Sequence, residues 1–209
     1  MDEKLIDIYA VATFFFSTGG TFWTNNTKWK SGDSVCIWHG IGCDEEDHVI
    51  SISLANNYLR GNLPPAVGLL APRQVDDNKT TMGLTKLDLS YNYIKGSIPE
   101  EVALLTSMEE FKVNGNELSG IIPFGISSWT GLENASFTEN NLEGEIPGGW
   151  CEQTDAQQIA VDCSKVKCSC CTPSCFTDQE ELIDATWAGA TASPSRSDDK
   201  EKSDHPKGE

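Results

Sequence analysis

The sequence predicts an α/β repeat solenoid, in which similar coils stack along one axis and place short strands side by side in a parallel sheet. Two observations predict this fold. The motif Asn-x-(Leu/Ile)-x-Gly occurs at spacings of 35, 24 and 24 residues, and its copies begin at Asn57, Asn92, Asn116 and Asn140. Each copy is also followed by an apolar residue and a proline. Self-similarity at such a period is the sequence signature of stacked coils.

The apolar residues that precede each motif predict one strand per coil. They recur at fixed offsets, and the last two of each set stand two positions apart, which is the periodicity of a half-buried β-strand. These residues are Val49, Ile52 and Leu54, then Leu84, Leu87 and Leu89, then Met108, Phe111 and Val113, and then Leu132, Ala135 and Phe137. One coil buries only a stripe, so the coils must stack to close a core.

The full repeat reads LxxLxLxxNxLxGxIPxx(L/V)xxL. Its asparagine, glycine and proline each have a physical role after the strand. The Asn amide can bond to backbone groups where the chain turns off the strand. Glycine supplies an unusual backbone conformation, and proline removes a donor where the next stretch is not a ladder strand.

With its Gly-x-Ile-Pro element, as in Gly96 to Pro99, the repeat resembles the plant-type leucine-rich repeat family. Upstream, Ser17 to Gly20, Trp23, Trp29 and the segment from Cys36 to Cys43 are similar to the paired-cysteine N-terminal cap of plant and diatom receptor-like extracellular domains. The resemblance implies a right-handed solenoid with a concave parallel sheet, an amphipathic helix at about Leu5 to Phe16, and a Cys36–Cys43 disulfide that closes a loop over the first coil. It also implies extracellular recognition, but it gives no ligand.

We expect four parts in the chain. Residues 1–48 would form the N-terminal cap, 49–147 the four leucine-rich repeats, 148–176 a cysteine-rich C-terminal cap, and 177–209 an acidic tail. From Ala188 to Glu209 there is no aromatic or branched aliphatic residue, so this tail cannot bury enough surface to offset its ordering entropy and is expected to be disordered.

The longer first spacing places an insertion near residues 71–83. Its polar composition, with Pro72 and the run from Asp76 to Thr81, indicates a flexible loop on the convex or edge side. A tolerated insertion without a role explains the spacing equally well.

The C-terminal cap keeps the 24-residue phase but loses the turn motif, so we interpret Ala156 to Cys163 as a fifth, capping strand. Its cysteines are expected to form disulfides that cover the end of the core, with a pairing that the sequence leaves open. They are Cys151, Cys163, Cys168, Cys170, Cys171 and Cys175. A soft metal such as Zn²⁺ is the alternative, but the spacing lacks a CxxC pair, and no metal is expected.

Charge excludes two classes of partner. With 32 Asp and Glu against 15 Lys and Arg, the net charge is −17. Such a surface repels phosphate backbones and anionic lipid head groups, so neither nucleic acid nor a membrane surface is expected as a partner. No stretch reaches the roughly 18 apolar residues of a membrane-spanning helix, so we expect no transmembrane segment in this chain.

The sequence also lacks the motifs of common catalytic sites. It contains no GxSxG, no HExxH, no phosphate-cradling GxxxxGK[ST] and no dinucleotide-binding GxGxxG after a strand. A nucleophilic pair of Cys36 or Cys43 with His39 would require a free thiolate, whereas the two cysteines are better explained as partners of each other. We therefore expect a protein that is not an enzyme and has no cofactor.

Function is expected on the concave face, because side chains that flank the apolar strand residues project from every coil onto one curved surface. Tyr91 is the best anchor, with Asp88 and Lys112 beside it. For any single residue, an ordinary polar strand exterior is the alternative explanation. The candidate ligand-binding residues are Lys86, Asp88, Ser90, Tyr91, Lys112, Asn114, Ser136, Thr138 and Glu139.

The expected function is recognition of a protein or peptide, in a receptor-like, co-receptor-like or inhibitor-like role. The alternatives are a structural or adhesive protein of a cell surface or wall matrix, and a cytoplasmic scaffold. The cysteine content favours an extracellular or cell-surface location. The N-terminus does not resemble a signal peptide, which indicates either an incomplete N-terminus or a cytoplasmic protein. Sequons at Asn25, Asn78 and Asn134 would accept glycans in a secreted chain.

Overall fold

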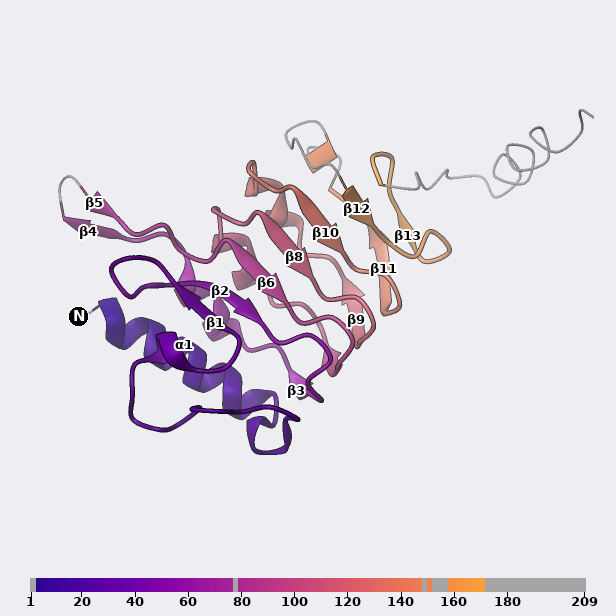
Figure 1. Ribbon diagram of the computed structural model, residues 1–209. Coiled ribbons are helices and arrows are strands. Elements are labelled where there is room, and N and C mark those ends of the chain that lie inside the picture. The colour runs from indigo at the N-terminus through magenta and orange to yellow at the C-terminus, as the bar shows by residue number, and fades with distance from the viewer. Residues whose placement is uncertain (1–2, 77–78, 148–149, 152–157, 172–209) are drawn as a thin grey trace, which may run out of the picture. The chain divides into compact units, whose positions relative to one another are not determined.

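The computed structural model describes residues 3–76, 79–147, 150–151 and 158–171. Within these residues the chain forms stacked coils, and a typical coil runs from a strand in one sheet to a strand in a second sheet and then to a short 3₁₀ helix (Figure 1). The expected acidic tail at 177–209 lies outside the described residues.

The concave sheet contains the strands that the repeat predicts. Its parallel strands are β2 (Val49–Ser53), β6 (Lys86–Asp88), β8 (Glu110–Lys112), β10 (Asn134–Ser136) and β12 (Gln158–Ala160), in that order. β1 (Ile41–Cys43) adds an antiparallel strand beside β2. The register aligns Ile52, Leu87, Phe111, Ala135 and Ile159 in one buried row. The expected capping strand is therefore present as β12, and its apolar residue continues the row.

A second parallel sheet was not predicted. It consists of β3 (Arg60–Asn62), β7 (Tyr93–Gly96), β9 (Glu117–Ile121), β11 (Asn141–Glu145) and β13 (Val166–Lys167). These strands coincide with the turn motif, where each coil contributes a single buried residue such as Ile94 or Leu118. One buried apolar residue per coil is too little for a periodicity, so the sequence indicates only a turn in this stretch.

Short 3₁₀ helices complete the coils on the convex side. They are η3 (Pro65–Leu70), η4 (Glu100–Leu104) and η5 (Phe124–Ser128), and they pack against one another in series. The residue immediately before each helix is a proline, at Pro64, Pro99 and Pro123. The fixed backbone of proline suits the extended N-cap position from which each helix starts.

The N-terminal cap closes one end of this stack. Its helix, α1 (Glu3–Ser17), packs on η3, and the chain continues through η1 (Gly20–Phe22) and η2 (Val35–Ile37). A chain of ring contacts runs from Phe15 through Trp23 and Trp29 to Trp38, with successive centroid distances of 5.1, 4.8 and 5.0 Å. The Cys36–Cys43 disulfide ties η2 to β1. This end of the core is therefore covered by aromatic side chains, and the paired-cysteine cap is confirmed.

The insertion near residues 71–83 differs from the flexible loop that was expected. It contains an antiparallel pair, β4 (Gln74–Asp76) and β5 (Lys79–Thr80). At its base, Arg73 donates to Glu3 at 2.7 Å and to the carboxylate of Asp7. Asp7 is only 2% exposed and also accepts from the amide of Val49 at 3.1 Å. A buried carboxylate requires such partners, so the insertion supplies the cation that the cap helix needs.

Disulfides tie the C-terminal cap together. Cys151 pairs with Cys170 and Cys168 pairs with Cys171, while Cys163 is also disulfide-bonded and Cys175 lies outside the described residues. The sulfur atoms of Cys151, Cys168 and Cys170 lie within 4.8 Å of one another. Because each of them is bonded to another sulfur, none is a thiolate ligand for Zn²⁺ in this pairing.

No helix among the described residues combines the length and the hydrophobicity needed to cross a bilayer.

Candidate functional site

A ladder of buried asparagines fixes the end of each concave strand. The Asn92 side chain accepts from the amides of Asn57 and Leu59, and it donates to the carbonyls of Leu54 and Leu89, all at 2.9–3.0 Å. The motif asparagines of the next two coils, Asn116 and Asn140, repeat this arrangement. Each amide thereby bonds its own coil to the preceding one, which holds the outward residues in register.

Asp162 takes the place of asparagine in the capping coil. Its carboxylate accepts from the amides of Glu139 and Asn140, at 3.0 and 3.3 Å. A carboxylate has no hydrogens to donate. Asp162 therefore accepts from amides of the preceding coil but cannot bond to carbonyl groups of its own coil.

The outward side chains of the concave strands form two rows. The parallel register aligns Ser51, Lys86, Glu110, Asn134 and Gln158 in the first row. It aligns Ser53, Asp88, Lys112, Ser136 and Ala160 in the second row. The surface therefore carries charges in its middle coils and small or amide side chains toward the C-terminal cap.

Glu110 joins the charged part of this surface. Its carboxylate lies 3.0 Å from the ammonium of Lys86 and 2.6 Å from that of Lys112. Burial works against ionisation of Glu110, but the hydrogen bonds and charges of the two lysines outweigh it and hold its pKa below the usual value. The same hydrogen bond to Glu110, opposed by burial and aided by the charges of Glu110 and Asp88, raises the pKa of Lys112.

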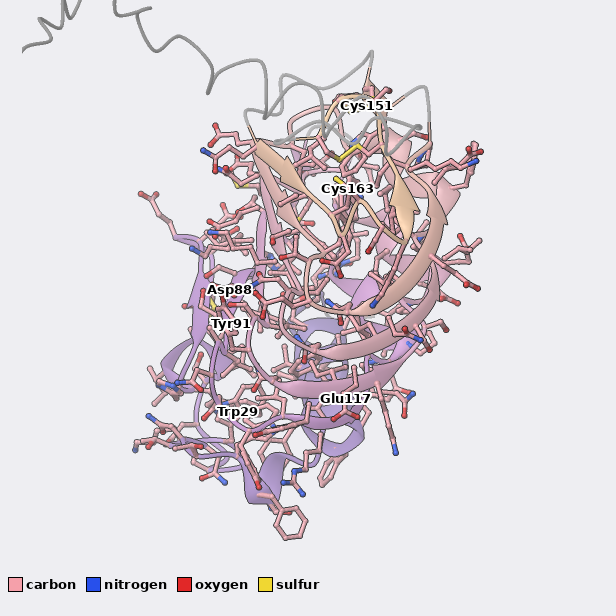
Figure 2. All side chains as sticks on the ribbon, turned by 90° about the vertical axis from the view of Figure 1, so that its right-hand side faces the viewer. Trp29, Asp88, Tyr91, Glu117, Cys151 and Cys163 are labelled. Atoms are coloured by element: carbon pink, nitrogen blue, oxygen red, sulfur yellow. A yellow bond between two sulfur atoms is a disulfide. The ribbon has the colours of Figure 1, made fainter. Side chains whose placement is uncertain are left out.

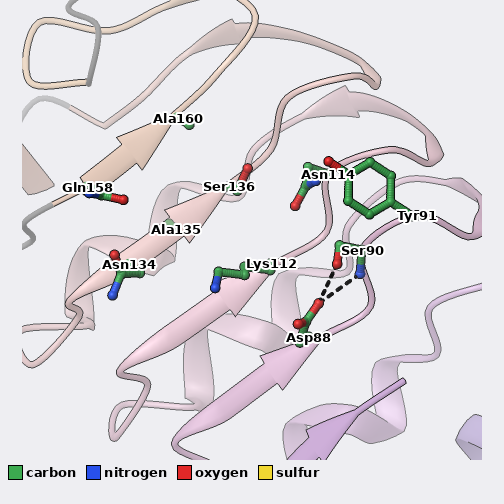
Figure 3. Close-up of a pocket in the computed structure, with 10 residues that line it drawn as sticks. All are labelled: Asp88, Ser90, Tyr91, Lys112, Asn114, Asn134, Ala135, Ser136, Gln158 and Ala160. Atoms are coloured by element: carbon green, nitrogen blue, oxygen red, sulfur yellow. Dashed lines mark hydrogen bonds between the residues drawn. The ribbon is translucent and has the colours of Figure 1, made fainter. Parts of the chain in front are cut away.

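A hollow of about 450 Å³ opens beside these charges (Figure 3). It forms because the second row shrinks from Lys112 to Ser136 and Ala160, so the face is lower on the C-terminal side. The remaining lining is polar and comes from Asp88, Ser90, Tyr91, Asn114, Asn134 and Gln158, together with Ala135. The hollow offers donors and acceptors of both kinds, as a peptide backbone requires.

Asp88 is held in place by Ser90. The backbone amide and the hydroxyl of Ser90 both donate to one carboxylate oxygen of Asp88, at 3.0 and 2.7 Å (Figure 3). Ser90 is itself buried, so its hydroxyl is committed to Asp88. The second carboxylate oxygen of Asp88 has no hydrogen bond among the described residues, which leaves it an acceptor for a ligand.

Tyr91 is an exposed member of the hollow, with 56% of its surface accessible. It is in the left-handed conformation at φ 55°, and so are the residues before the motif asparagine in the other coils, at Asn56, Gly115 and Glu139. The left-handed turn lets the chain leave the concave strand in every coil. In this coil it carries the tyrosine ring to the rim of the hollow.

The structure brings together most, but not all, of the candidate residues. The hollow is not lined by Lys86, Thr138 or Glu139, although Glu110 pairs with both Lys86 and the lining residue Lys112. Four lining residues were not among the candidates, namely Asn134, Ala135, Gln158 and Ala160. Strand alternation places Asn134 and Gln158 on the outward face. The sequence signal for the hollow was the loss of side-chain size along the outward row, from Lys112 to Ser136 and Ala160.

The chain is a leucine-rich repeat solenoid. The Leucine Rich Repeat family matches it at residues 83–105, which is the coil that carries Asp88 and Tyr91. A probable inactive leucine-rich repeat receptor-like protein kinase of Arabidopsis thaliana is 42% identical over 52 residues, and a second probable kinase of this type is 40% identical over 55 residues. These stretches cover 24% and 26% of the chain but only 8% and 6% of those relatives.

Solved plant ectodomains have the same fold. The BIR2 ectodomain of Arabidopsis thaliana superposes with a TM-score of 0.64 at 23% identity, over 74% of this chain and 78% of that one. A chain of the BIR3–SERK2 complex from the same plant superposes with a TM-score of 0.54 at 26% identity, over 75% of this chain and 82% of that one.

Proposed function

We propose that the chain is a non-catalytic recognition module that binds a protein or peptide segment on its concave face. The observation that carries this proposal is the hollow between Asp88, Lys112 and Asn114, with Tyr91 at its rim. It combines a cation, an anion with a free acceptor, amide groups and one exposed aromatic ring. These are the groups that anchor peptide segments at protein interfaces.

The likeness to plant ectodomains supports the same proposal. The BIR3–SERK2 structure is a complex of two proteins, and the HAESA ectodomain of the same fold was solved with a peptide hormone. In the part of the chain that the structure describes, the concave sheet has five parallel strands, which fit a short segment rather than a long ligand. A co-receptor-like or inhibitor-like role therefore fits it better than the role of a long-ligand receptor.

The binding proposal is tested with variants of the hollow. Secreted, purified chain would be screened against an array of plant ectodomains and secreted peptides, and any binder would be titrated by calorimetry. Tyr91→Ala and Lys112→Ala should each weaken binding about tenfold or more, because interface anchors are worth upward of about 1–2 kcal/mol. Leu104→Ala, at an exposed position of the helix η4 that lines neither sheet's hollow, is the matched control. Undiminished binding by both hollow variants would place the site elsewhere.

We also propose that the chain acts outside the cytosol, because its described cysteines are joined in disulfides that persist in oxidising compartments. The test is the intact mass of protein from its native source, alkylated with and without prior reduction. Cysteines that become reactive only after reduction support the secretory route, and added glycan mass would support it further. Free thiols throughout would make a cytoplasmic scaffold the better explanation.

A further inference from the structure

On the second sheet, away from the concave face, an arginine lies between two exposed tyrosines. The guanidinium carbon of Arg60 is 4.1 Å from the ring centroid of Tyr58 and 5.3 Å from that of Tyr93. The two rings meet edge to face at 5.0 Å, and Arg60 donates a hydrogen bond to the Tyr58 hydroxyl. Both tyrosines remain more than two-fifths exposed. We call these residues, together with Lys95, the Arg60 cluster.

Strand register explains how the Arg60 cluster forms. Arg60 of β3 pairs with Tyr93 of β7, and Asn62 pairs with Lys95 two positions further along. Ile94, between Tyr93 and Lys95, points into the core, so its two neighbours point to solvent. Tyr93 and Lys95 therefore stand side by side next to Arg60, and a hollow of about 310 Å³ lies between them and Glu117.

The backbone holds Tyr58 in an uncommon conformation to complete the cluster. Tyr58 has φ 64°, whereas the equivalent residues Tyr93, Glu117 and Asn141 do not have positive φ. A bulky residue rarely adopts this conformation, because its side chain crowds the following carbonyl. The conformation carries the ring onto Arg60, so this chain bears a local cost at the one coil where the cluster forms.

The two cations of the cluster form no ion pair among the described residues, although Lys95 lies opposite Glu117 in the register of β7 and β9. Glu117 is the single acidic residue that lines the hollow. In a chain of net charge −17, two cations without an ion pair beside one hollow favour an anionic ligand.

The cluster is separate from the concave hollow. Figure 2 shows Glu117, which borders the Arg60 cluster, on the opposite side of the coil from Asp88 and Tyr91. The residues that line the two hollows do not overlap. A partner on one face therefore leaves the other face accessible.

We propose that the Arg60 cluster is a second binding surface, for an acidic peptide segment of a protein partner. Arg60 and Lys95 would bind its carboxylates, and the tyrosine rings would pack against its apolar atoms, since tyrosine and arginine dominate protein interfaces. The rings stand at 76° to each other, so they form no flat platform on which a sugar ring could stack across both. This geometry favours a peptide over an acidic carbohydrate.

The test is nuclear magnetic resonance titration of the isotope-labelled full chain with the capped peptide Glu-Phe-Glu-Phe-Glu. We expect the amide signals of Tyr58, Tyr93 and Lys95 and the guanidinium signal of Arg60 to shift, while those of Lys112 and Asn114 stay in place. The same peptide with glutamine for glutamate should bind at least about tenfold more weakly, because hydrogen bonds to charged groups are worth about 1.5–3 kcal/mol.

The variants separate this proposal from the concave one. Arg60→Gln combined with Lys95→Gln should weaken the peptide about tenfold or more, whereas Lys86→Gln with Lys112→Gln is the matched control and should leave it unchanged. Unchanged dispersion of the remaining signals shows that each variant is folded. The proposal would be overturned if the peptide shifted the signals of both double variants equally. It would also be overturned if the shifts were confined to the concave face or if no signal shifted. A galacturonic acid trimer that binds the cluster more tightly than the peptide would overturn it as well.

Discussion

The ring of Tyr91 lies directly over Gly115 of the next coil. A Cβ atom on Gly115 would stand only 2.6 Å from Cδ1 of Tyr91, and Gly115 itself has φ 68°. The glycine therefore serves two purposes at once. It allows the left-handed turn, and it leaves the space in which the tyrosine ring rests at the rim of the concave hollow.

Gly115→Ala is expected to destabilise the chain by about 1–2 kcal/mol, the usual cost of a left-handed conformation for a residue with a Cβ. It should also displace the Tyr91 ring, which urea unfolding and the Tyr91 ring signals in magnetic resonance would measure. Gly131→Ala is the matched control, because a Cβ there meets nothing within 4 Å and the backbone is not left-handed. Equal stability of the two variants would contradict the packing described.

Asn116→Ala should cost about 1–3 kcal/mol of unfolding free energy. The change removes the side-chain acceptor of the buried Ile94 amide, and an unsatisfied buried group costs about this much, whereas the carbonyls of Leu89 and Val113 keep their bonds from Asn92 and Asn140. Asn134→Ala, on the outward row, is the control and should stay within about 0.5 kcal/mol. Denaturant unfolding of the unglycosylated chains compares them, and similar losses would argue against the ladder.

Removal of the Arg73 side chain should destabilise the N-terminal cap by about 3 kcal/mol, because it leaves the buried carboxylate of Asp7 without its cation. Arg73→Met retains most of the bulk and isolates the charge effect. Asp7→Asn in the same chain should restore part of the loss. Lys4→Met, in the exposed pair with Asp47, should cost less than about 1 kcal/mol. Thermal unfolding measures all four, and no loss in Arg73→Met would make the insertion a dispensable loop.

The charged part of the concave face should lose stability at both ends of the pH scale. The pKa of Glu110 is lowered in the folded state, so its contribution is present above the ordinary value of 4.5 and disappears as pH falls through the folded value. The pKa of Lys112 is raised, so its contribution disappears as pH rises through a value above 10.5. The difference in unfolding free energy between the parent and Glu110→Gln should be about 0.5 kcal/mol at neutral pH and should vanish in acid. A pH-independent difference would contradict the ion pairs.

The sequence predicted the concave sheet because each of its strands buries residues two positions apart, as Leu87 and Leu89 do, and because the motif repeats in phase. It did not predict the second sheet, where each coil buries only one residue in or next to the strand, such as Ile94 or Leu59. Within the site, the candidate residues followed from strand alternation alone. The hollow did not follow from alternation, because its depth depends on the contrast between Lys112 and the smaller Ser136 and Ala160 of the next two coils, which becomes visible only when the register is known.

The contact between the insertion and the cap helix could not be predicted from the sequence either. Arg73 and Asp7 are 66 residues apart, and nothing near Asp7 in the sequence indicates that its carboxylate is buried. A carboxylate in an apolar helix was a visible anomaly, but its partner could have been any cation in the chain. The Arg60 cluster was hidden for the same reason, since Tyr58 and Tyr93 become neighbours only through the pairing of β3 with β7.

Each motif asparagine bonds to backbone groups that precede its own coil, so the stack has a direction. The number of coils in the stack can therefore change. A further 24-residue unit placed after residue 121 would receive the bonds of Asn140 on one side and offer equivalent groups on the other. The two capped ends would be unaffected. Gene-level duplication or deletion of single units would thus change how many outward rows a ligand meets, so lineages that carry this chain could vary the reach of its binding face without redesigning the scaffold.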